Sequence, residues 1–333
     1  MRNEMNGLTL DDIAKELGLS VSTVSRALAG KGRVSEKNRR AVFEAAKRMG
    51  YTVNAMARGL RESDSKLIGV IVTEMSNVFF ANILSGIQRV CRENGYAAIV
   101  CSTEENADME AEAVMRLSEK RISALIIACV GMSIGERPFP VVYIDNEPRD
   151  TSNCVSVTGD NYKAAFDITR RMIDRGYRRI GMLTGPLCQS SAEYRYLGFR
   201  DALSAGGLAL REELVRSCEF SQSSGKKEMR VLLDSDERPD AMLFASNFIA
   251  YGGIHAIRQA GIRIPEDIGI AAFDAYDNTG LIEPRIASVN QPAMEIGVRA
   301  CERALELING GKVSLRTVLE MSFTDGDSMR KRN

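Results

Sequence analysis

The amino-acid sequence predicts an N-terminal all-α helix-turn-helix domain followed by a larger α/β body of two lobes with parallel sheets. The first part is indicated by two short helical patterns separated by a glycine, within residues 9–29, and by a third helical pattern that ends at Gly50. The second part is indicated by continuous apolar runs that alternate with amphipathic helices from Leu67 onwards. That alternation is typical of parallel sheets with both faces covered by helices.

Residues 9–29, TLDDIAKELGLSVSTVSRALA, favour a helix-turn-helix. Thr9 can cap the first helix, and the two aspartates that follow suit its positive end. Gly18 can adopt the positive φ that a tight turn needs, and Ser20 can cap the second helix. A tight turn is therefore expected to join the two helices.

The second helix is expected to have an inner and an outer side. Its inner side is assigned Val21, Val24 and Leu28 by helical spacing. Its outer side carries short hydrogen-bond donors and one arginine, namely Ser22, Thr23, Ser25 and Arg26. Such side chains can enter a DNA major groove and contact base edges. The alternative is a generic helical hairpin, since matches to this pattern are often false.

A third helix, capped by Ser35, completes a domain over residues 1–50. Residues 51–65 form a separate piece, in which Asn54 can cap a short helix that ends at Leu60. That helix is weak in isolation because it is short and contains a glycine. We expect a hinge helix and linker here.

Charge is distributed unevenly along the chain. The whole sequence is neutral, but residues 1–62 carry a net charge of +5 and the remainder −5. A basic head on an acidic body is typical of a small polyanion-binding module attached to a domain with another task.

The body, residues 66–333, contains at least seven apolar runs that suit strands. They lie at 67–72, 97–101, 124–130, 141–144, 179–185, 241–246 and 268–275. Amphipathic helices that end at a glycine are expected between them, at 79–94, 161–175, 192–205 and 248–260. About 260 residues of this pattern exceed one ordinary domain, so two similar lobes are expected.

Several classes of protein are disfavoured. The seven cysteines occur singly, with no Cys-x-x-Cys pair, which favours buried thiols and a reduced cytoplasm. The first residues have no apolar segment of a signal peptide, and no apolar run approaches the ~18 residues of a membrane span. Met5 could be an alternative start to Met1.

Catalytic and cofactor motifs are not found. No Gly-x-Gly-x-x-Gly follows a strand, and there is no P-loop sequence. His255 is the only histidine, and it lies in a helix without a metal-spaced partner, so we interpret it as structural. We therefore expect no metal, no cofactor and no enzyme activity.

The order of these parts resembles the lactose repressor (LacI/GalR) family of bacterial transcription factors over nearly the whole chain. The most specific stretch is TLDDIAKELGLSVSTVSRALAG, followed by VSEKNRRAVFEAAKRMGY and the hinge NAMARGL. In the body, the similar segments are SNVFFANILSGI, AEYRYLGFRDAL, GIRIPEDIGIAAFD and SVNQP.

The resemblance implies a body like the type I periplasmic sugar-binding proteins, crossed three times by the chain. By that analogy lobe 1 holds about 66–158 and 288–316, and lobe 2 about 159–287 and 317–333. It also implies a homodimer, or a dimer of dimers, on double-stranded DNA with a near-palindromic operator.

The resemblance further implies residues that contact DNA. Val21, Ser22 and Arg26 match the base-reading helix, although Val21 could pack instead and Arg26 could contact a phosphate. The other candidates on the head, mostly for phosphate contacts, are Thr9, Ser20, Thr23, Ser25, Asn38 and Arg39. In the hinge the candidates are Asn54, Ala57, Arg58 and Leu60. Leu60 is expected to act as a minor-groove wedge, or to pack against the hinge of a second copy.

In the body, Arg195 and Asp274 resemble the residues with which the family binds its effector. The alternative for both is a structural salt bridge. Asp145 is a further candidate, because it lies at the end of an expected strand. Phe79, Phe80 and Phe220 match positions of ligand-stacking aromatics, although they could equally belong to the core. Ser246 and Asn247 are weaker candidates because the family commonly has Asn-Asp there.

We therefore predict a transcriptional repressor controlled by a small molecule bound between two lobes. We expect a sugar or sugar derivative, because an arginine and carboxylates suit adjacent hydroxyls. A nucleobase or a partner protein as the signal remains an alternative, as does a solute-binding protein. The sequence does not decide between an inducer and a corepressor.

Overall fold

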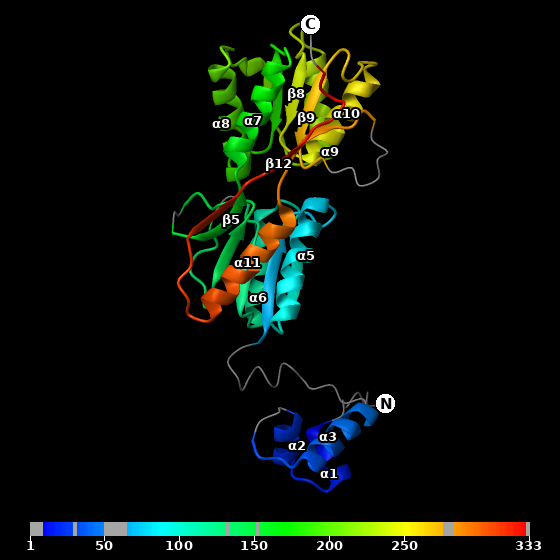
Figure 1. The fold of residues 1–333 in the computed structure, drawn as a ribbon, viewed down its shortest axis with the longest axis vertical. Coiled ribbons are helices and arrows are strands. Elements are labelled where there is room, and N and C mark those ends of the chain that lie inside the picture. The colour runs from blue at the N-terminus through cyan, green and yellow to red at the C-terminus, as the bar shows by residue number, and fades with distance from the viewer. Residues whose placement is uncertain are drawn as a thin grey trace. The chain divides into compact units, whose positions relative to one another are not determined.

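The structure, a computed structural model, describes residues 9–28, 32–49, 65–130, 133–150, 153–275 and 283–330 (Figure 1). The chain divides into two compact units, Met1–Ser65 and Lys66–Asn333, which are described here one at a time. The residues of the expected hinge helix, Asn54, Ala57, Arg58 and Leu60, lie outside the described residues.

The described part of the first unit contains three helices, α1 (Leu10–Leu17), α2 (Val21–Leu28) and α3 (Glu36–Met49). Thr9 caps α1, because its side chain accepts a hydrogen bond from the Asp12 N–H and the Asp12 carboxylate accepts one from the Thr9 N–H at 2.8 Å. Gly18 ends α1 with a φ of 62°. The predicted cap and turn are both confirmed.

The core of this unit is small and consists of aliphatic residues from all three helices, Ile13, Ala14, Val24, Ala27, Val42, Ala45 and Ala46. Val21, which we assigned to the inner side of α2, is instead 42% exposed. At about 100° per residue, Val21 lies roughly 90° around the helix from the midpoint of Val24 and Ala27. The assignment of Val21 to the inner side was therefore wrong.

Lobe 1 of the second unit is built on a six-stranded sheet of parallel pairs in the order β11-β5-β4-β3-β1-β2. Its strands are β1 (Leu67–Val72), β2 (Ala97–Ser102), β3 (Ala124–Ile127), β4 (Val141–Ile144), β5 (Val155–Gly159) and β11 (Arg316–Leu319). Its helices are α5 (Val78–Glu93), α6 (Ala107–Glu119) and α11 (Ala293–Ile308).

Lobe 2 has a second six-stranded sheet, in the order β12-β10-β9-β8-β6-β7, in which only β12 is antiparallel to its neighbour. Its strands are β6 (Ile180–Thr184), β7 (Val215–Ser217), β8 (Ala241–Phe244), β9 (Gly269–Phe273), β10 (Ala287–Asn290) and β12 (Ser322–Thr324). Its helices are α7 (Asn161–Asp174), α8 (Ser190–Ala205), α9 (Gln222–Leu233) and α10 (Asn247–Gln259), with a short 3-10 helix at Glu212–Leu214.

The chain crosses between the lobes after β5, after β10 and after β11 (Figure 1). Strand pairing moves two expected borders by a few residues. The segment from 288 was expected in lobe 1, but β10 pairs with β9 and β12 and so belongs to lobe 2. The segment after 316 was expected in lobe 2, but β11 pairs with β5 in lobe 1.

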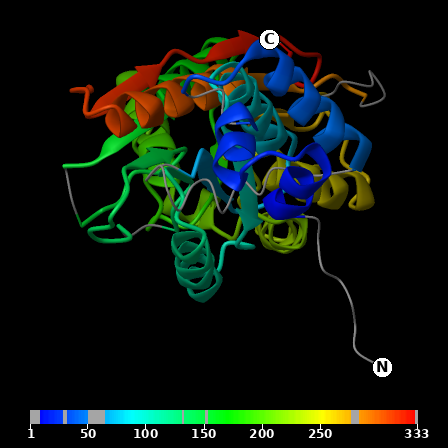
Figure 2. The same cartoon turned by 90° about the horizontal axis from the view of Figure 1, so that it is seen from below.

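Each sheet is buried on both faces, as its strands' apolar composition requires. In β1, Ile68, Val70 and Val72 pack with α5 and α11, whereas Ile71 packs on the other face with residues of α6. Figures 1 and 2 show α6 and α11 on different sides of the body. No helix in the described ranges is long and apolar enough to span a membrane.

Two glycines allow α5 and α11 to cross closely. A Cβ at Gly86 would lie 2.2 Å from the Met294 carbonyl oxygen, and one at Gly297 would lie 2.0 Å from that of Ile83. Both distances are far shorter than any real carbon–oxygen contact, so only glycine fits. This contact fixes α5, whose N-terminal end lines the cavity described below.

Candidate functional site

The first candidate site is the exposed face of α2 in the N-terminal unit. Ser22 and Arg26 are exposed there, together with Val21. The Ser20 hydroxyl caps α2 by accepting from the Thr23 N–H at 3.2 Å, and it lies 3.0 Å from the Ser22 hydroxyl. The predicted base-reading side chains therefore share one accessible surface.

Arg26 lies along this surface rather than extending away from it. Its Nε donates to the Ser22 carbonyl at 3.1 Å, one turn earlier in the helix. Thr23 and Ser25 on α2 are half-buried, as are Asn38 and Arg39 in the first turn of α3, whereas Thr9 and Ser20 are exposed. An arginine held by a surface hydrogen bond can reorient toward a phosphate or a guanine edge at small cost.

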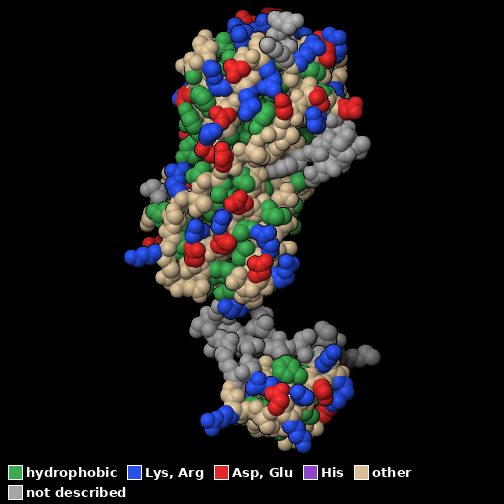
Figure 3. All heavy atoms as spheres, viewed as in Figure 1, with side chains coloured by type: hydrophobic (Ala, Val, Ile, Leu, Met, Phe, Trp, Pro, Cys, Tyr) green, Lys and Arg blue, Asp and Glu red, His purple; other side chains and the backbone are tan. Residues whose placement is uncertain are grey.

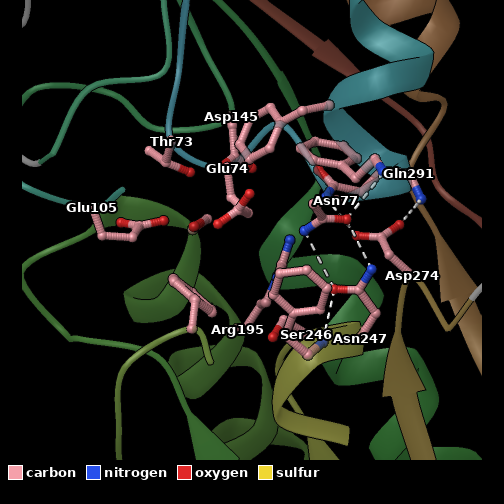
Figure 4. A pocket seen from close by; sticks show the side chains of 15 residues that line it. Thr73, Glu74, Asn77, Glu105, Asp145, Arg195, Ser246, Asn247, Asp274 and Gln291 are labelled. Atoms are coloured by element: carbon pink, nitrogen blue, oxygen red, sulfur yellow. Dashed lines mark hydrogen bonds between the residues drawn. The ribbon is translucent and has the colours of Figure 1, made fainter. Parts of the chain in front are cut away.

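The second candidate site is a cavity between the two lobes of the body (Figure 4). All eight residues predicted for the effector line it: Phe79, Phe80, Asp145, Arg195, Phe220, Ser246, Asn247 and Asp274. The cavity lies where parallel strands of both sheets end, since Asp145 directly follows β4 and Asp274 directly follows β9. Ligand sites of open α/β sheets are typically found at this edge.

Arg195 is held firmly by lobe 2. It is only 3% exposed, its Nε donates to the Asn161 side-chain oxygen at 2.7 Å, and its Nη1 donates to the Ala245 carbonyl at 2.5 Å. Its guanidinium lies over the ring of Phe273, 4.2 Å from the centroid. The side chain is therefore pre-positioned at the cavity wall.

The two aspartates share an unusual backbone conformation. Asp145 has a φ of 62° and Asp274 a φ of 53°, which is the left-handed region that aspartate tolerates better than most residues. The Asp274 carboxylate accepts hydrogen bonds from the Gln291 backbone N–H at 2.9 Å and from its side-chain amide at 2.8 Å. Gln291 directly follows β10, where the chain crosses from lobe 2 to lobe 1. These hydrogen bonds therefore connect Asp274 of lobe 2 to the crossing segment.

Burial raises the pKa of Asp145 to about 6. The Arg195 charge acts in the opposite direction, but Glu105 and Asp274 add repulsion that raises the pKa further. Asp145 therefore titrates closer to neutral pH than an ordinary aspartate.

The phenylalanine candidates both line the cavity and belong to the hydrophobic core or pack beside it. Phe79 and Phe80 are each 4% exposed, pack edge to face with ring centroids 5.0 Å apart, and belong to the lobe 1 core. They also line the cavity, as does Phe220, whose ring lies against Gly185. These rings form an apolar wall that also belongs to the protein interior.

Hydrogen bonds join the two lobes beside the cavity. Asn77, the N-cap of α5, and Asn247 of α10 exchange side-chain hydrogen bonds at 2.8 and 3.4 Å. Elsewhere, the side chain of Asn146 donates to that of Gln189 at 3.1 Å, and Gln189 donates to Glu105 at 2.7 Å. The cavity has a volume of about 50 Å³, which is room for a few water molecules. Entry of a larger ligand therefore requires these contacts to loosen.

Sequence reasoning missed almost half of the lining residues, namely Thr73, Glu74, Asn77, Glu105, Ser191, Phe248 and Gln291. They lie shortly after strands or in the first turns of helices. Those positions could have been listed from the apolar runs alone, since loops after parallel strands gather at one edge. Which of them face the cavity depends on the packing of the two lobes.

Comparisons with known proteins agree with this arrangement. Residues 9–54 match the family model of bacterial regulatory proteins of the lacI family. Residues 65–323 match the model of periplasmic binding proteins and the sugar binding domain of the LacI family. The HTH-type transcriptional repressor PurR of Photorhabdus laumondii is 29% identical over 93% of this chain and 93% of its own.

Solved structures show the same fold over nearly the whole chain. The lac repressor dimer bound to operator and the anti-inducer ONPF has a TM-score of 0.86 at 24% identity, with 98% of this chain and 100% of that chain covered. The complex of the transcriptional regulator CelR with cellobiose has a TM-score of 0.74 at 26% identity, with 96% and 99% covered. By the two family models together, the chain belongs to the LacI family of bacterial transcriptional regulators.

Proposed function

We propose that the chain is a repressor whose affinity for operator DNA is set by a small molecule bound between the lobes. The observation that carries this proposal is the convergence of polar side chains from both lobes on one cavity at strand ends. A ligand that contacts both lobes favours the lobe arrangement in which those contacts form. Its effect on DNA affinity equals the coupling free energy between the two sites.

The effector class that the cavity suits best is a sugar or sugar derivative. Arg195 supplies fixed donors, whereas Asp145 and Asp274 supply acceptors, so adjacent hydroxyl groups can be bound by complementary partners. The apolar wall of phenylalanine rings suits the C–H face of a pyranose. The CelR structure with cellobiose supports this class.

A nucleobase is the second candidate. It is favoured by the similarity to the PurR repressors over 93% of the chain, and by rings of Phe79, Phe80 and Phe220 beside which a planar base could stack. A sugar and a nucleobase require different polar contacts, so a binding screen with both classes of ligand can distinguish the two candidate effectors.

On the DNA side, the exposed face of α2 is proposed to read the major groove as part of a homodimer, or a dimer of dimers, on a near-palindromic operator. Residues 51–65 are proposed to form a hinge helix on DNA, with Leu60 as the minor-groove wedge and Ala57 close to the groove floor. A hinge that folds only on DNA can transmit a change in lobe arrangement to the head.

A direct test uses the full chain. Its preferred duplex is first selected from a random library, and its melting temperature is then screened against neutral sugars, sugar derivatives and nucleobases. Each ligand that raises the melting temperature is added to the protein–operator complex, and the affinity is measured by fluorescence anisotropy. At least one such ligand is expected to change operator affinity by about five-fold or more. If no duplex is enriched, or no stabilising ligand alters affinity, the proposed function is wrong.

A further inference from the structure

The cavity is strongly acidic. Four carboxylates line it, Glu74, Glu105 and Asp145 from lobe 1 and Asp274 from lobe 2, whereas Arg195 is the one cation among the described lining residues. Residues 131–132, 151–152 and 276–282, which the structure does not describe, contain no lysine or arginine. Figure 3 shows acidic and basic side chains mixed over the visible face of the body, where no comparable acidic cluster is seen.

The positive groups at the cavity are partly engaged by the protein. Arg195 donates to Asn161 and to the Ala245 carbonyl. The first N–H groups of two helices, which could hold an anion, are capped by side chains of their own helices. Asn77 accepts from the Phe79 N–H at 3.1 Å, and Asn247 accepts from the Phe248 N–H at 2.8 Å. An anionic ligand would compete with these contacts.

The carboxylates, in contrast, keep acceptor capacity. Each has two oxygens with about four acceptor sites. The structure shows single donors to two of them, the Ser76 N–H to Glu74 at 2.9 Å and the Gln189 amide to Glu105 at 2.7 Å. Glu105 and Asp274 also disfavour ionisation of Asp145, so each of these two charges repels that of Asp145. A bound cation would relieve that repulsion, and a bound anion would increase it.

Aromatic rings complete a cation-binding environment. Phe79, Phe80, Phe220 and Phe248 line the same cavity as the carboxylates. The face of an aromatic ring attracts a cation, as the position of Arg195 over the core residue Phe273 illustrates. Carboxylates and ring faces together are the groups that bind a protonated amine best.

We propose that the effector of this repressor is a polyhydroxylated molecule that bears a protonated amine and no phosphate or carboxylate group, as an amino sugar does. This proposal rests on the function proposed above and narrows its effector class. A phosphorylated sugar of the same size is excluded, because its two negative charges would face four carboxylates across a cavity with one engaged arginine.

Matched ligand series test the proposal on the full chain. Glucosamine, galactosamine and mannosamine are compared with their parent hexoses, N-acetyl forms and 6-phosphates by thermal shift and titration calorimetry at pH 7.5. At least one free amine is expected to bind about ten-fold more tightly than both its parent hexose and its N-acetyl form, and no 6-phosphate is expected to bind. The proposal is overturned if a 6-phosphate or a neutral form binds as tightly as the amine. It is equally overturned if none of the three amines stabilises the protein.

Charge-neutral variants distinguish a charge effect from loss of a hydrogen bond. Glu74→Gln and Glu105→Gln are expected to weaken binding of the amine about three- to ten-fold, and binding of the parent hexose by a clearly smaller factor. Glu104→Gln is the matched control, since Glu104 is exposed, adjacent to Glu105 and not part of the cavity lining. Equal weakening of amine and hexose would contradict the role of charge.

The two proposals fail in different ways. If a neutral or phosphorylated ligand changes operator affinity, this inference is wrong and the proposed function stands. If the amine binds but operator affinity does not respond to any ligand, the function is wrong and the charge preference stands.

Discussion

At the scale of single residues, three of the acidic residues that line the cavity have energetically unfavourable backbone conformations. Glu105, Asp145 and Asp274 all have positive φ angles, at 58°, 62° and 53°. Residues with such backbones tend to lie at functional sites, where the surrounding structure over-determines them. The resemblance to a family identified Asp145 and Asp274 from the sequence, but Glu105 has no such motif. Its place in the cavity depends on the turn after β2, which the sequence alone does not show.

Asp145→Asn is expected to stabilise the protein at neutral pH. A buried carboxyl with a raised pKa favours the folded state at pH values below its unfolded pKa of 3.8, and that contribution is lost as the pH rises through about 6. Removal of the charge should therefore raise the free energy of unfolding by about 1 to 3 kcal/mol at pH 7.5 and by much less at pH 4.5. Asparagine also tolerates the left-handed backbone. Urea unfolding at both pH values measures the difference.

Asp150→Asn is the control, because the pKa of Asp150 is shifted in the opposite direction to that of Asp145. Hydrogen bonds from Ser133 lower the pKa of Asp150, so its contribution to stability is present at neutral pH and lost as the pH falls. An equal gain in stability from both variants at pH 7.5 would contradict the assignment for Asp145.

Arg195→Ala is expected to abolish the response of operator affinity to the effector. If the effector is an inducer, operator binding without ligand should remain; if it is a corepressor, tight DNA binding should be lost under all ligand conditions. Arg200→Ala is the matched control, because Arg200 lies on the same helix and is exposed. Anisotropy titrations with and without the effector measure the response. An unchanged response in Arg195→Ala would show that this side chain is structural.

At the scale of helices and strands, continuous apolar strands could be predicted, whereas short polar strands and several helices could not. β1 and β4 were predicted with their observed ends, because each is a continuous apolar run. β7, with the sequence VRS, and β12, with the sequence SFT, have no such run and are strands only because a neighbour pairs with them. α6 and α9 were not singled out, since their apolar residues are diluted by charged or small polar ones. The secondary structure of such segments is determined by the strands and helices that they pair with or pack against.

Gly86→Ala is expected to disrupt the crossing of α5 and α11. The added methyl group would meet the Met294 backbone oxygen, which cannot rotate away, so the helices must separate. The expected loss is about 2 kcal/mol or more, on the scale of overpacked cores. Chemical unfolding measures it, with the exposed neighbour Ser85→Ala as the control. Equal unfolding midpoints for Gly86→Ala and the parent protein would refute the close contact.

At the scale of the whole molecule, the opposite net charges of residues 1–62 and of the remainder match the division into two compact units. The fold class was predicted correctly from alternation and length, whereas the approximate lobe borders came from the resemblance to a family. The identity of the effector could not be predicted, because it depends on how side chains from distant segments combine in one cavity.

Removal of residues 1–65 is expected to abolish DNA binding and leave the body folded. The body has its own buried cores, and the basic charge lies in the removed part. For the full chain, the logarithm of DNA affinity should fall steeply and linearly with the logarithm of salt concentration, because lysines and arginines displace counterions. Fluorescence anisotropy at several salt concentrations measures the DNA affinity of the full chain and of the truncated protein. Circular dichroism shows whether the truncated protein is folded. A truncated body with the same affinity and salt slope would disprove the role of the head.

The three crossings also dictate the order in which the molecule can be completed on the ribosome. Lobe 1 needs α11 and β11, which are synthesised after most of lobe 2, and lobe 2 needs β12 and the buried Ser328, whose hydroxyl binds the Ile270 carbonyl at 2.7 Å. The three helices of the head form contacts within about 40 residues and can assemble early in translation. The head can therefore fold before the two lobes are complete. In that interval, we expect a nascent chain to present a formed α2 surface without a complete cavity between the lobes.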